Sequence, residues 1–135
     1  MKIKAAGERP TRAGPADYFT GTVWMEPVIE APDPARANAV IVTFAAGART
    51  FWHTHPLGQT LHVLSGTGRV QMEGGPVRAI RAGDTVWIPP GEKHWHGAAP
   101  ENAMTHLAIH ERHESKGHVA WLEEVEESDY IRNPR

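Results

Sequence analysis

The sequence predicts an all-β fold, formed by one domain that spans residues 1–135. Two observations predict this fold class. Thirteen glycines and eleven prolines are spread along the chain, which suits many short strands joined by tight turns. Between them lie short segments rich in β-branched and aromatic residues, several with apolar side chains at alternate positions. A chain of 135 residues is also the usual length of one domain.

The elements are expected in the following order. Residues 1–17 form an extended N-terminal arm, and residues 27–34 a loop. In the segment 39–44, Val40, Val42 and Phe44 share one face of a strand. The sequence Ser-Gly-Thr-Gly at 65–68 indicates a turn, and Gly74-Gly75 indicates a hairpin. Apolar and acidic residues lie on opposite sides of the segment 118–130, which predicts a short C-terminal helix. The remaining predicted strands cover residues 18–25, 60–64, 69–73, 77–80, 85–88 and 103–111.

Composition and charge exclude several functional classes. The formal net charge is −2, and no basic run is present that would follow a phosphate backbone, so nucleic-acid binding is not expected. The chain has no cysteine, and therefore neither disulfides nor thiolate ligands. The first residues lack the apolar core of a signal peptide, and no apolar run has membrane-spanning length. A cytoplasmic protein without membrane contact is the expectation.

Two separated segments carry the residue types of a metal site. His53 and His55 are two residues apart, so on a strand their imidazoles project from the same face, and Gln59 follows with an amide oxygen. His94 comes just after a Pro-Gly turn in the second segment. Imidazoles and an oxygen donor that converge on one point are typical ligands of a divalent metal. We therefore predict that His53, His55, Gln59 and His94 hold one divalent ion.

The spacing of these residues resembles a known family. Residues 47–66 have the form Gly-x5-His-x-His-x3-Gln-x6-Gly, and residues 83–94 the form Gly-x5-Pro-x-Gly-x2-His. Both resemble the signature motifs of the cupin superfamily. The resemblance implies a small antiparallel barrel of the double-stranded β-helix, or jelly-roll-like, type. Two departures are Gln59, where the family usually has Glu, and Ala98, where it often has Asn.

The neutral amide of Gln59 affects the expected chemistry. Without a carboxylate, a bound metal stabilises high oxidation states less and polarises a bound hydroxyl more strongly, which favours Lewis-acid work over redox cycling. Four protein ligands leave a coordination position for water or substrate, as in catalytic sites. The ligand types permit Mn, Fe, Co, Ni or Zn.

Three further histidines are candidates for proton transfer. His96 has the parity of His94, and His106 and His110 share one face of the strand at 103–111. Histidine both accepts and donates a proton near neutral pH, so three inward histidines beside a metal indicate catalysis. The remaining histidines, His62, His113 and His118, are expected at the surface. Thr50 is a candidate to offer its hydroxyl group to a substrate. The candidate apolar side chains of the substrate pocket are Phe51, Val40, Val42 and Phe44.

A closer resemblance covers most of residues 14–111. The segments 14–21, 48–50, 52–60, 91–100 and 103–109 are similar to the bacterial manganese-dependent cupin hydroxynitrile lyases, and Gln59 matches that group. The resemblance implies cleavage and formation of aromatic cyanohydrins such as mandelonitrile, with Mn as the metal and R stereopreference. Two alternatives remain: an Fe-dependent cupin dioxygenase with the same ligands, and a non-catalytic cupin that binds a small ligand.

The outer face of the last long strand predicts self-association. If the histidines of residues 103–111 point inward, Leu107 and Ile109 form an apolar stripe that points outward. Such a stripe requires a cover, which a partner subunit, the N-terminal arm or the C-terminal helix could provide. We expect a homo-oligomer, either a dimer or a tetramer.

Overall fold

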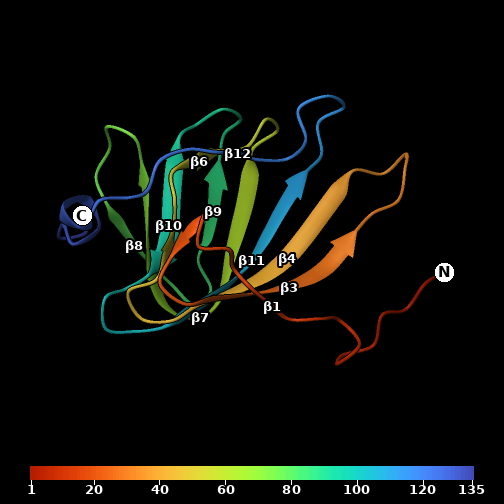
Figure 1. Cartoon of the computed structure of the whole chain (residues 1–135), viewed down its shortest axis with the longest axis horizontal. Helices are drawn as coiled ribbons and strands as arrows, with labels where there is room; N and C mark the ends of the chain where they lie inside the picture. Colours follow the sequence, from red (N-terminus) through yellow and green to blue (C-terminus); the bar gives the residue numbers. More distant parts are fainter.

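In the computed structural model, which describes all 135 residues, the chain forms twelve β-strands and one short helix (Figure 1). The all-β prediction is therefore confirmed. The elements are β1 (Arg12–Ala13), β2 (Phe19–Thr20), β3 (Val23–Glu30), β4 (Ala37–Phe44), β5 (Arg49–Thr50), β6 (His53–Thr54), β7 (Gln59–Met72), β8 (Arg78–Arg81), β9 (Thr85–Ile88), β10 (His94–Ala98), β11 (Met104–Glu111), β12 (Ala120–Trp121) and α1 (Glu127–Tyr130). The one helix has four residues, and none in the structure has the length and apolar character needed to cross a membrane.

A single antiparallel sheet curls around on itself, and β7 joins its two halves (Figure 1). The main strand order is β1-β3-β4-β11-β7-β10-β5-β2. The first part of β7 pairs with β11 and β9, whereas its last part pairs with β8 and β10. The predicted turn at residues 65–68 is wrong, because the strand bends there without ending. Gly66 has a φ of +77° at this bend, a conformation that glycine adopts without strain.

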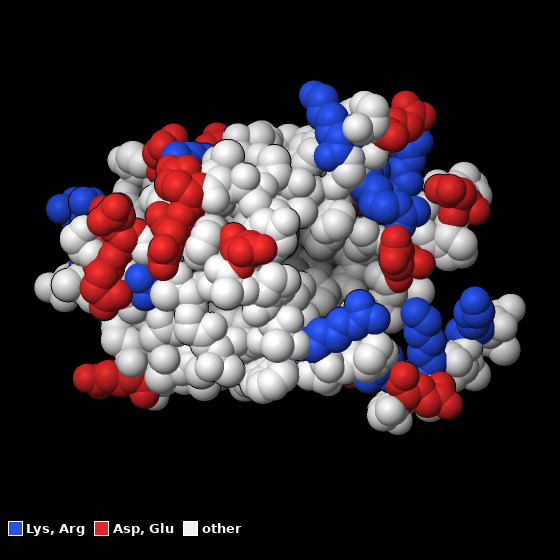
Figure 2. Space-filling model, viewed as in Figure 1, with Lys and Arg blue, Asp and Glu red and all other residues white.

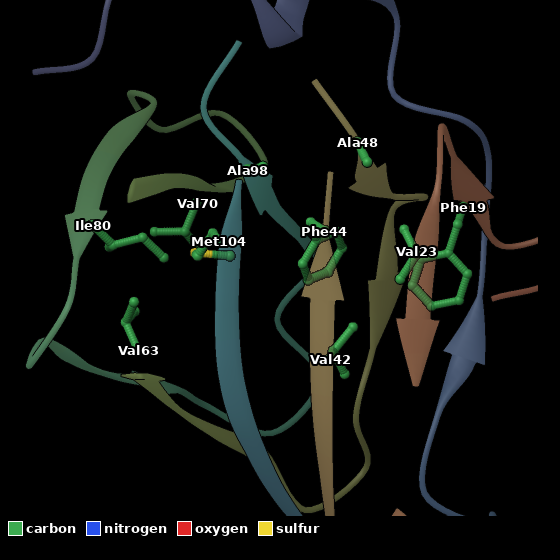
Figure 3. Close-up of a cluster of buried hydrophobic side chains, with 10 residues drawn as sticks. All are labelled: Phe19, Val23, Val42, Phe44, Ala48, Val63, Val70, Ile80, Ala98 and Met104. Atoms are coloured by element: carbon green, nitrogen blue, oxygen red, sulfur yellow. The ribbon is translucent and has the colours of Figure 1, made fainter. Parts of the chain in front are cut away.

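The core lies between the two halves of the curled sheet. Phe44 and Val42 point inward from β4, as their predicted shared face requires, and Met104 points inward from β11 (Figure 3). From the other half, Ala98, Val70 and Ile80 meet them. Within one half, β10 and the neighbouring β5 approach closely, and a Cβ on Gly97 would lie 2.4 Å from the carbonyl oxygen of Ala48. Glycine at this position allows the strand that carries His94 and His96 to pack against β5.

The predicted loop at residues 27–34 is wrong over its first half. Val23–Glu30 is an eight-residue strand, paired on one side with β4 and on the other with the short β1 of the N-terminal arm. Pro27 is accommodated because the register shifts between Pro27 and Ile29. A proline in a sheet is tolerated at such an irregularity, where its missing N–H breaks no ladder bond.

The C-terminal helix is confirmed, but it is shorter than predicted. Only Glu127–Tyr130 is helical, and the preceding residues cross the sheet in an extended conformation. Trp121 pairs with His53 through β12, and Leu122 and Glu123 exchange backbone hydrogen bonds with Trp52. The helix was predicted because positions four apart share a side in a helix and also in a strand. The sequence pattern of Trp121 and Val125 therefore does not distinguish the two conformations.

Candidate active site

A cavity of about 260 Å³ lies inside the curl of the sheet. Strands β3, β4 and β11 line one side, and β5, β6, β10 and the crossing segment at 118–121 line the other. The surface viewed in Figure 2 is hollowed near its middle, where few charged side chains gather, whereas Lys, Arg, Asp and Glu cluster toward the two ends of that face. The cavity thus combines an apolar wall with buried polar groups and solvent access.

Three of the predicted metal ligands share one hydrogen-bonding pattern. Their Nδ1 atoms each lie within hydrogen-bonding distance of a backbone carbonyl oxygen: His53 with Phe51 at 2.9 Å, His55 with His118 at 2.6 Å and His94 with Glu92 at 2.9 Å. A carbonyl oxygen only accepts, so Nδ1 carries the proton in each ring. The Nε2 atoms are therefore left with free lone pairs, as a metal ligand requires.

These rings converge on one point. The ring centroids of His53 and His94 are 4.2 Å apart, and His55 lies 5.1 Å from His53 and 5.6 Å from His94. The Oε1 atom of Gln59 is 3.4 Å from Nε2 of His94, so two lone-pair donors face each other. A cation bound by both atoms would stabilise this arrangement. The four predicted ligands thus lie near one another and their donor types suit a divalent metal, but His55 is outside the group of histidines whose ligand atoms lie within 4.8 Å of one another.

The tightest group of nitrogen atoms includes one further histidine. Ligand atoms of His53, His94 and His96 all lie within 4.8 Å of one another, and all three residues are buried. His96 differs from the other rings because its Nδ1 meets a side chain and not a backbone carbonyl. Three buried histidines in this position could hold a metal ion. The two signature segments supply His53 and His94, and His96 follows two residues after the second segment.

Burial keeps the candidate ligands neutral. Loss of solvent lowers the pKa of His55 and of His94 from 6.5 to about 4. Burial, followed by the neighbouring imidazoles His94 and His55, lowers the pKa of His53 well below its usual value. Neutral imidazole is the form that binds metals, so the apolar surroundings prepare these rings as ligands at neutral pH.

His96 and His106 form a hydrogen-bonded pair beside this cluster. Nε2 of His106 lies 3.0 Å from Nδ1 of His96, and the ring of Phe44 packs against both. Their remaining nitrogen atoms, Nε2 of His96 and Nδ1 of His106, are buried without a hydrogen-bond partner. Burial lowers the pKa of His106 to about 4 and that of His96 well below 6.5. Both rings are therefore neutral near pH 7. Because one ring donates a hydrogen bond to the other, one of the two unpaired nitrogens carries a lone pair that can accept a proton from a bound molecule.

His110 and His118 form a second stack at the other side of the cluster. The ring centroid of His110 lies 5.3 Å from that of His55 and 4.6 Å from that of His118. Nδ1 of His110 is buried without a partner, and burial lowers its pKa to about 3. The expected surface position of His118 is wrong, because this residue is half-buried and lines the cavity.

Unpaired buried atoms are concentrated in this cavity. Five buried side-chain nitrogen or oxygen atoms in the whole chain lack a hydrogen-bond partner, and four of them belong to His55, His96, His106 and His110. An unpaired buried polar atom costs free energy, so most such atoms in proteins are satisfied. Their concentration at one place is typical of a site that a ligand completes.

Comparison with known proteins agrees with this geometry. Residues 40–110 match the Cupin domain family. The chain belongs to the cupin family. It is 58% identical over 132 residues, covering 98% of this chain and 100% of the relative, to a protein from Granulicella tundricola named (R)-mandelonitrile lyase. The predicted resemblance to the cupin lyases is confirmed, as is the prediction that the protein is an enzyme of the lyase class.

Solved cupin structures share the fold. A cupin-like protein from Thermotoga maritima superimposes with a TM-score of 0.84 at 39% identity, covering 94% of this chain and 95% of that one. The polyketide cyclase RemF from Streptomyces resistomycificus superimposes with a TM-score of 0.70 at 19% identity, covering 96% and 90% of the two chains. The second likeness is one of fold alone.

Most of the predicted substrate contacts of this cupin line the cavity. Val40, Val42 and Phe44 form part of its wall, and Thr50 lies beside His96, whose backbone N–H donates to the Thr50 hydroxyl at 3.2 Å. Phe51 does not line the cavity, so its expected role as a wall is wrong. The chain bends at Trp52 before β6 begins, and the alternation of faces does not continue through that bend.

Sequence reasoning missed several residues that line the cavity. Phe19 and Met25 come from β2 and β3, and Trp121 comes from the crossing C-terminal segment. The Trp121 ring packs 4.7 Å from His53 and stacks on Tyr18 at 4.7 Å. Trp121 lies near the histidines because its segment is a strand that pairs with β6, whereas the sequence pattern predicted a helix there.

The buried histidines predict an acid-sensitive fold in the metal-free protein. His106 has a pKa of about 4 when folded and 6.5 when unfolded, so between these values the unfolded chain binds the additional proton. Stability that is present above pH 6.5 is therefore lost as the pH falls toward 4. One pKa unit corresponds to about 1.4 kcal/mol, so His106 alone accounts for a loss of roughly 3 kcal/mol in the free energy of unfolding over this pH range. Urea midpoints of chelator-treated protein, measured from pH 7 to 4, check this.

The same pH series on His106→Asn should show a smaller loss of stability between pH 7 and 4, because the variant lacks the ring of His106. A midpoint that stays constant or rises as the pH is lowered would contradict the assignment of neutral, desolvated imidazoles.

Proposed function

We propose that this protein is a hydroxynitrile lyase, which cleaves aromatic cyanohydrins such as mandelonitrile to an aldehyde and hydrogen cyanide and also catalyses the reverse reaction. The observation that carries the proposal is the cluster of unpaired histidine nitrogens around one cavity with an apolar wall. The relative named (R)-mandelonitrile lyase, identical at 58% of positions over its full length, supports the same reaction and the R stereopreference.

The proposed cofactor is one divalent metal ion, with Mn as the preferred metal. His53, His55, Gln59 and His94 would hold it, since their lone pairs converge and the three imidazoles have their Nδ1 atoms oriented by backbone carbonyls. His96 lies close enough to compete as a ligand, but its Nδ1 is engaged by another histidine. When bound, such an ion supplies Lewis-acid chemistry, which lowers the pKa of a hydroxyl group.

The histidine pair would move the hydroxyl proton. A ring nitrogen of His96 lies within 4.8 Å of ligand atoms of His53 and His94, and its Nε2 has no hydrogen-bond partner, so Nε2 can take the proton from the substrate hydroxyl. The positive charge is then shared with His106 across the 3.0 Å contact. The oxygen electrons form the carbonyl bond, the bond to the nitrile carbon breaks, and that carbon leaves with the electron pair as cyanide.

His110 and the apolar wall would complete the reaction. The His110 ring has an unpaired buried nitrogen next to His55, so it can hydrogen-bond to the leaving cyanide. The cyanide then takes up the proton that the His96–His106 pair removed, which gives hydrogen cyanide and returns the pair to its neutral form. Val40, Val42 and Phe44 offer a flat apolar surface to the aryl ring, and Thr50 offers a hydroxyl group next to His96. These contacts would select one face of the aldehyde.

The active form is proposed to be a homo-oligomer. Trp24, Leu64, Trp87 and Ile109 are exposed to between 39% and 59%. On the outer face, Ile109 pairs with Thr60, and Thr60 pairs with Trp87. Neither the N-terminal arm nor the helix covers this row. A second copy of the chain would remove the apolar side chains from water.

Removal of the metal should abolish the lyase activity. Treatment with a chelator, followed by dialysis, is expected to lower the rate of mandelonitrile cleavage at least a hundredfold, and Mn²⁺ should restore it. The assay follows benzaldehyde release, with metal content measured in parallel. Cleavage that continues in the metal-free protein would contradict the proposed cofactor.

The same assay without oxygen distinguishes the lyase from an Fe-dependent dioxygenase. Cyanohydrin cleavage consumes no oxygen, so the rate should be unchanged, whereas an oxygenase would stop. Ligand binding with no product under either condition would instead support a non-catalytic cupin.

Replacement of His106 by Ala should lower kcat on the order of a hundredfold, because a positioned acid–base group contributes about that much or more. His62→Ala is the matched control, since His62 lies on β7 and bonds to Thr85 on the outer face. Circular dichroism should show both variants folded. An unchanged kcat for His106→Ala and for His96→Ala would move the proton transfer to His110 or to water.

Light scattering should give a particle mass of two or four times the chain mass of 14.9 kDa. The double substitution Trp87→Glu and Ile109→Lys is expected to lower the mass toward that of one chain, because charge on this face opposes its burial. A native mass of one chain would contradict the proposed oligomer.

A further inference from the structure

A row of polar side chains crosses the sheet from the metal site toward the cavity mouth. In register, Gln59 on β7 pairs with His110 on β11, His110 with Asn38 on β4, and Asn38 with Glu30 on β3. All four line the cavity. Neighbouring strands lie about 4.8 Å apart, so the backbone of Asn38 is about 10 Å from that of Gln59. The row therefore ends in a second polar region, away from the candidate metal ligands.

The amide of Asn38 is held in one orientation. Its side chain is buried, with 9% of the residue exposed, and its Oδ1 accepts a hydrogen bond of 2.9 Å from Nη1 of Arg112. Arg112 also donates to the backbone carbonyls of Ala31 and Ala35, at 2.9 and 3.1 Å. Because arginine only donates, the oxygen of the amide must face it. The Nδ2 group is then left for the cavity, and no group in the chain accepts its hydrogens.

The charges around this amide favour a neutral partner with an O–H group. Glu30 lines the same part of the cavity with a side chain that is 77% exposed, and its carboxylate lies 3.9 Å from Arg112. An anion bound at Asn38 would be repelled by Glu30, whereas a hydroxyl group can accept from the Asn38 amide and donate to the Glu30 carboxylate. The other titratable groups near this region are Arg112 itself, Asp33, whose carboxylate lies 3.7 Å from Arg112, and the imidazoles of His110 and His118.

The apolar part of the cavity leads directly to this polar region. Phe44, Val42, Val40 and Asn38 occupy successive inward positions of β4, and the first three are apolar. Positions two apart on a strand are separated by about 7 Å. A benzene ring that packs on Val40 can therefore place one edge next to Asn38 and the other toward His106, which pairs with Val42, while His110 lies at the Asn38 end.

We propose that the substrates are aromatic cyanohydrins with a hydroxyl group on the far side of the ring, and that Asn38 is the residue that selects them. The proposal deepens the lyase function and rests on it for the reaction. Asn38 donates to the ring hydroxyl, Glu30 accepts from it, and Arg112 acts as a positioning residue that fixes the amide. Unsubstituted mandelonitrile offers Nδ2 no acceptor, so a ring that packs beside Asn38 displaces the water on this group without replacing its hydrogen bond, which costs binding free energy.

The kinetic test compares 4-hydroxymandelonitrile with 4-methylmandelonitrile, which has a substituent of similar size without a hydrogen bond. The wild-type enzyme is expected to favour the hydroxyl substrate in kcat/KM, and Asn38→Leu should lower that ratio roughly tenfold. Ile41→Val, on the outer face of the same strand, is the matched control and should leave the ratio unchanged. Arg112→Met should likewise lower the ratio of kcat/KM for the two substrates, because the Asn38 amide is then no longer held in one orientation.

A binding measurement keeps the test independent of catalysis. Calorimetric titration with 4-hydroxybenzyl alcohol and with 4-methylbenzyl alcohol should show a preference for the hydroxyl compound that Asn38→Leu removes, with thermal melting confirming a folded variant. If no cyanohydrin is cleaved, the lyase function fails while this titration still decides the role of Asn38. Equal preference in wild type and Asn38→Leu would overturn the inference.

Discussion

The orientation of the buried imidazoles by backbone carbonyls is the constraint on which the site depends. Buried polar groups in proteins are mostly hydrogen-bonded, and three histidines of this cavity place Nδ1–H on a backbone carbonyl oxygen. For His53 and His94 the acceptor lies two residues earlier in the chain, so the local strand conformation fixes these rings. For His55 the acceptor is the carbonyl of His118, far along the sequence. The C-terminal crossing segment is therefore part of the site as well as part of the fold.

Anchoring of that segment explains why the end of the chain is so firmly packed. The hydroxyl of Tyr130 donates to the carbonyl of Ala98, and the guanidinium of Arg49 lies 4.3 Å from the centre of the Tyr130 ring. In the sequence, Arg49 is next to Thr50, and Ala98 lies two residues after His96. The helix at the C-terminus thus stabilises both the crossing segment and the strands that carry the histidine pair.

The sequence predicted those features that depend on local alternation and on motif spacing. The shared face of Val40, Val42 and Phe44 follows from the period of a strand, and the convergence of His53, His55, Gln59 and His94 follows from two motifs whose glycines and prolines set the bends. Features that depend on contacts between distant segments were missed. His118 and Trp121 enter the cavity only because residues 118–123 pair with β6 and Trp52, and local periodicity contains no information on that pairing. Phe51 was misplaced by extending alternation across a bend.

The distribution of unpaired atoms links the stability of this protein to its function. Each unpaired buried nitrogen costs about 1–3 kcal/mol, and four of them lie in one cavity, while the whole net stability of a domain is about 5–15 kcal/mol. A fold selected for stability alone would replace these imidazoles with apolar side chains. The cost is tolerable when a cation and a substrate supply the missing partners, because binding to the folded state alone stabilises it. The rigid sheet holds the unpaired groups in place before any ligand arrives, and this preorganisation is what a catalytic site requires.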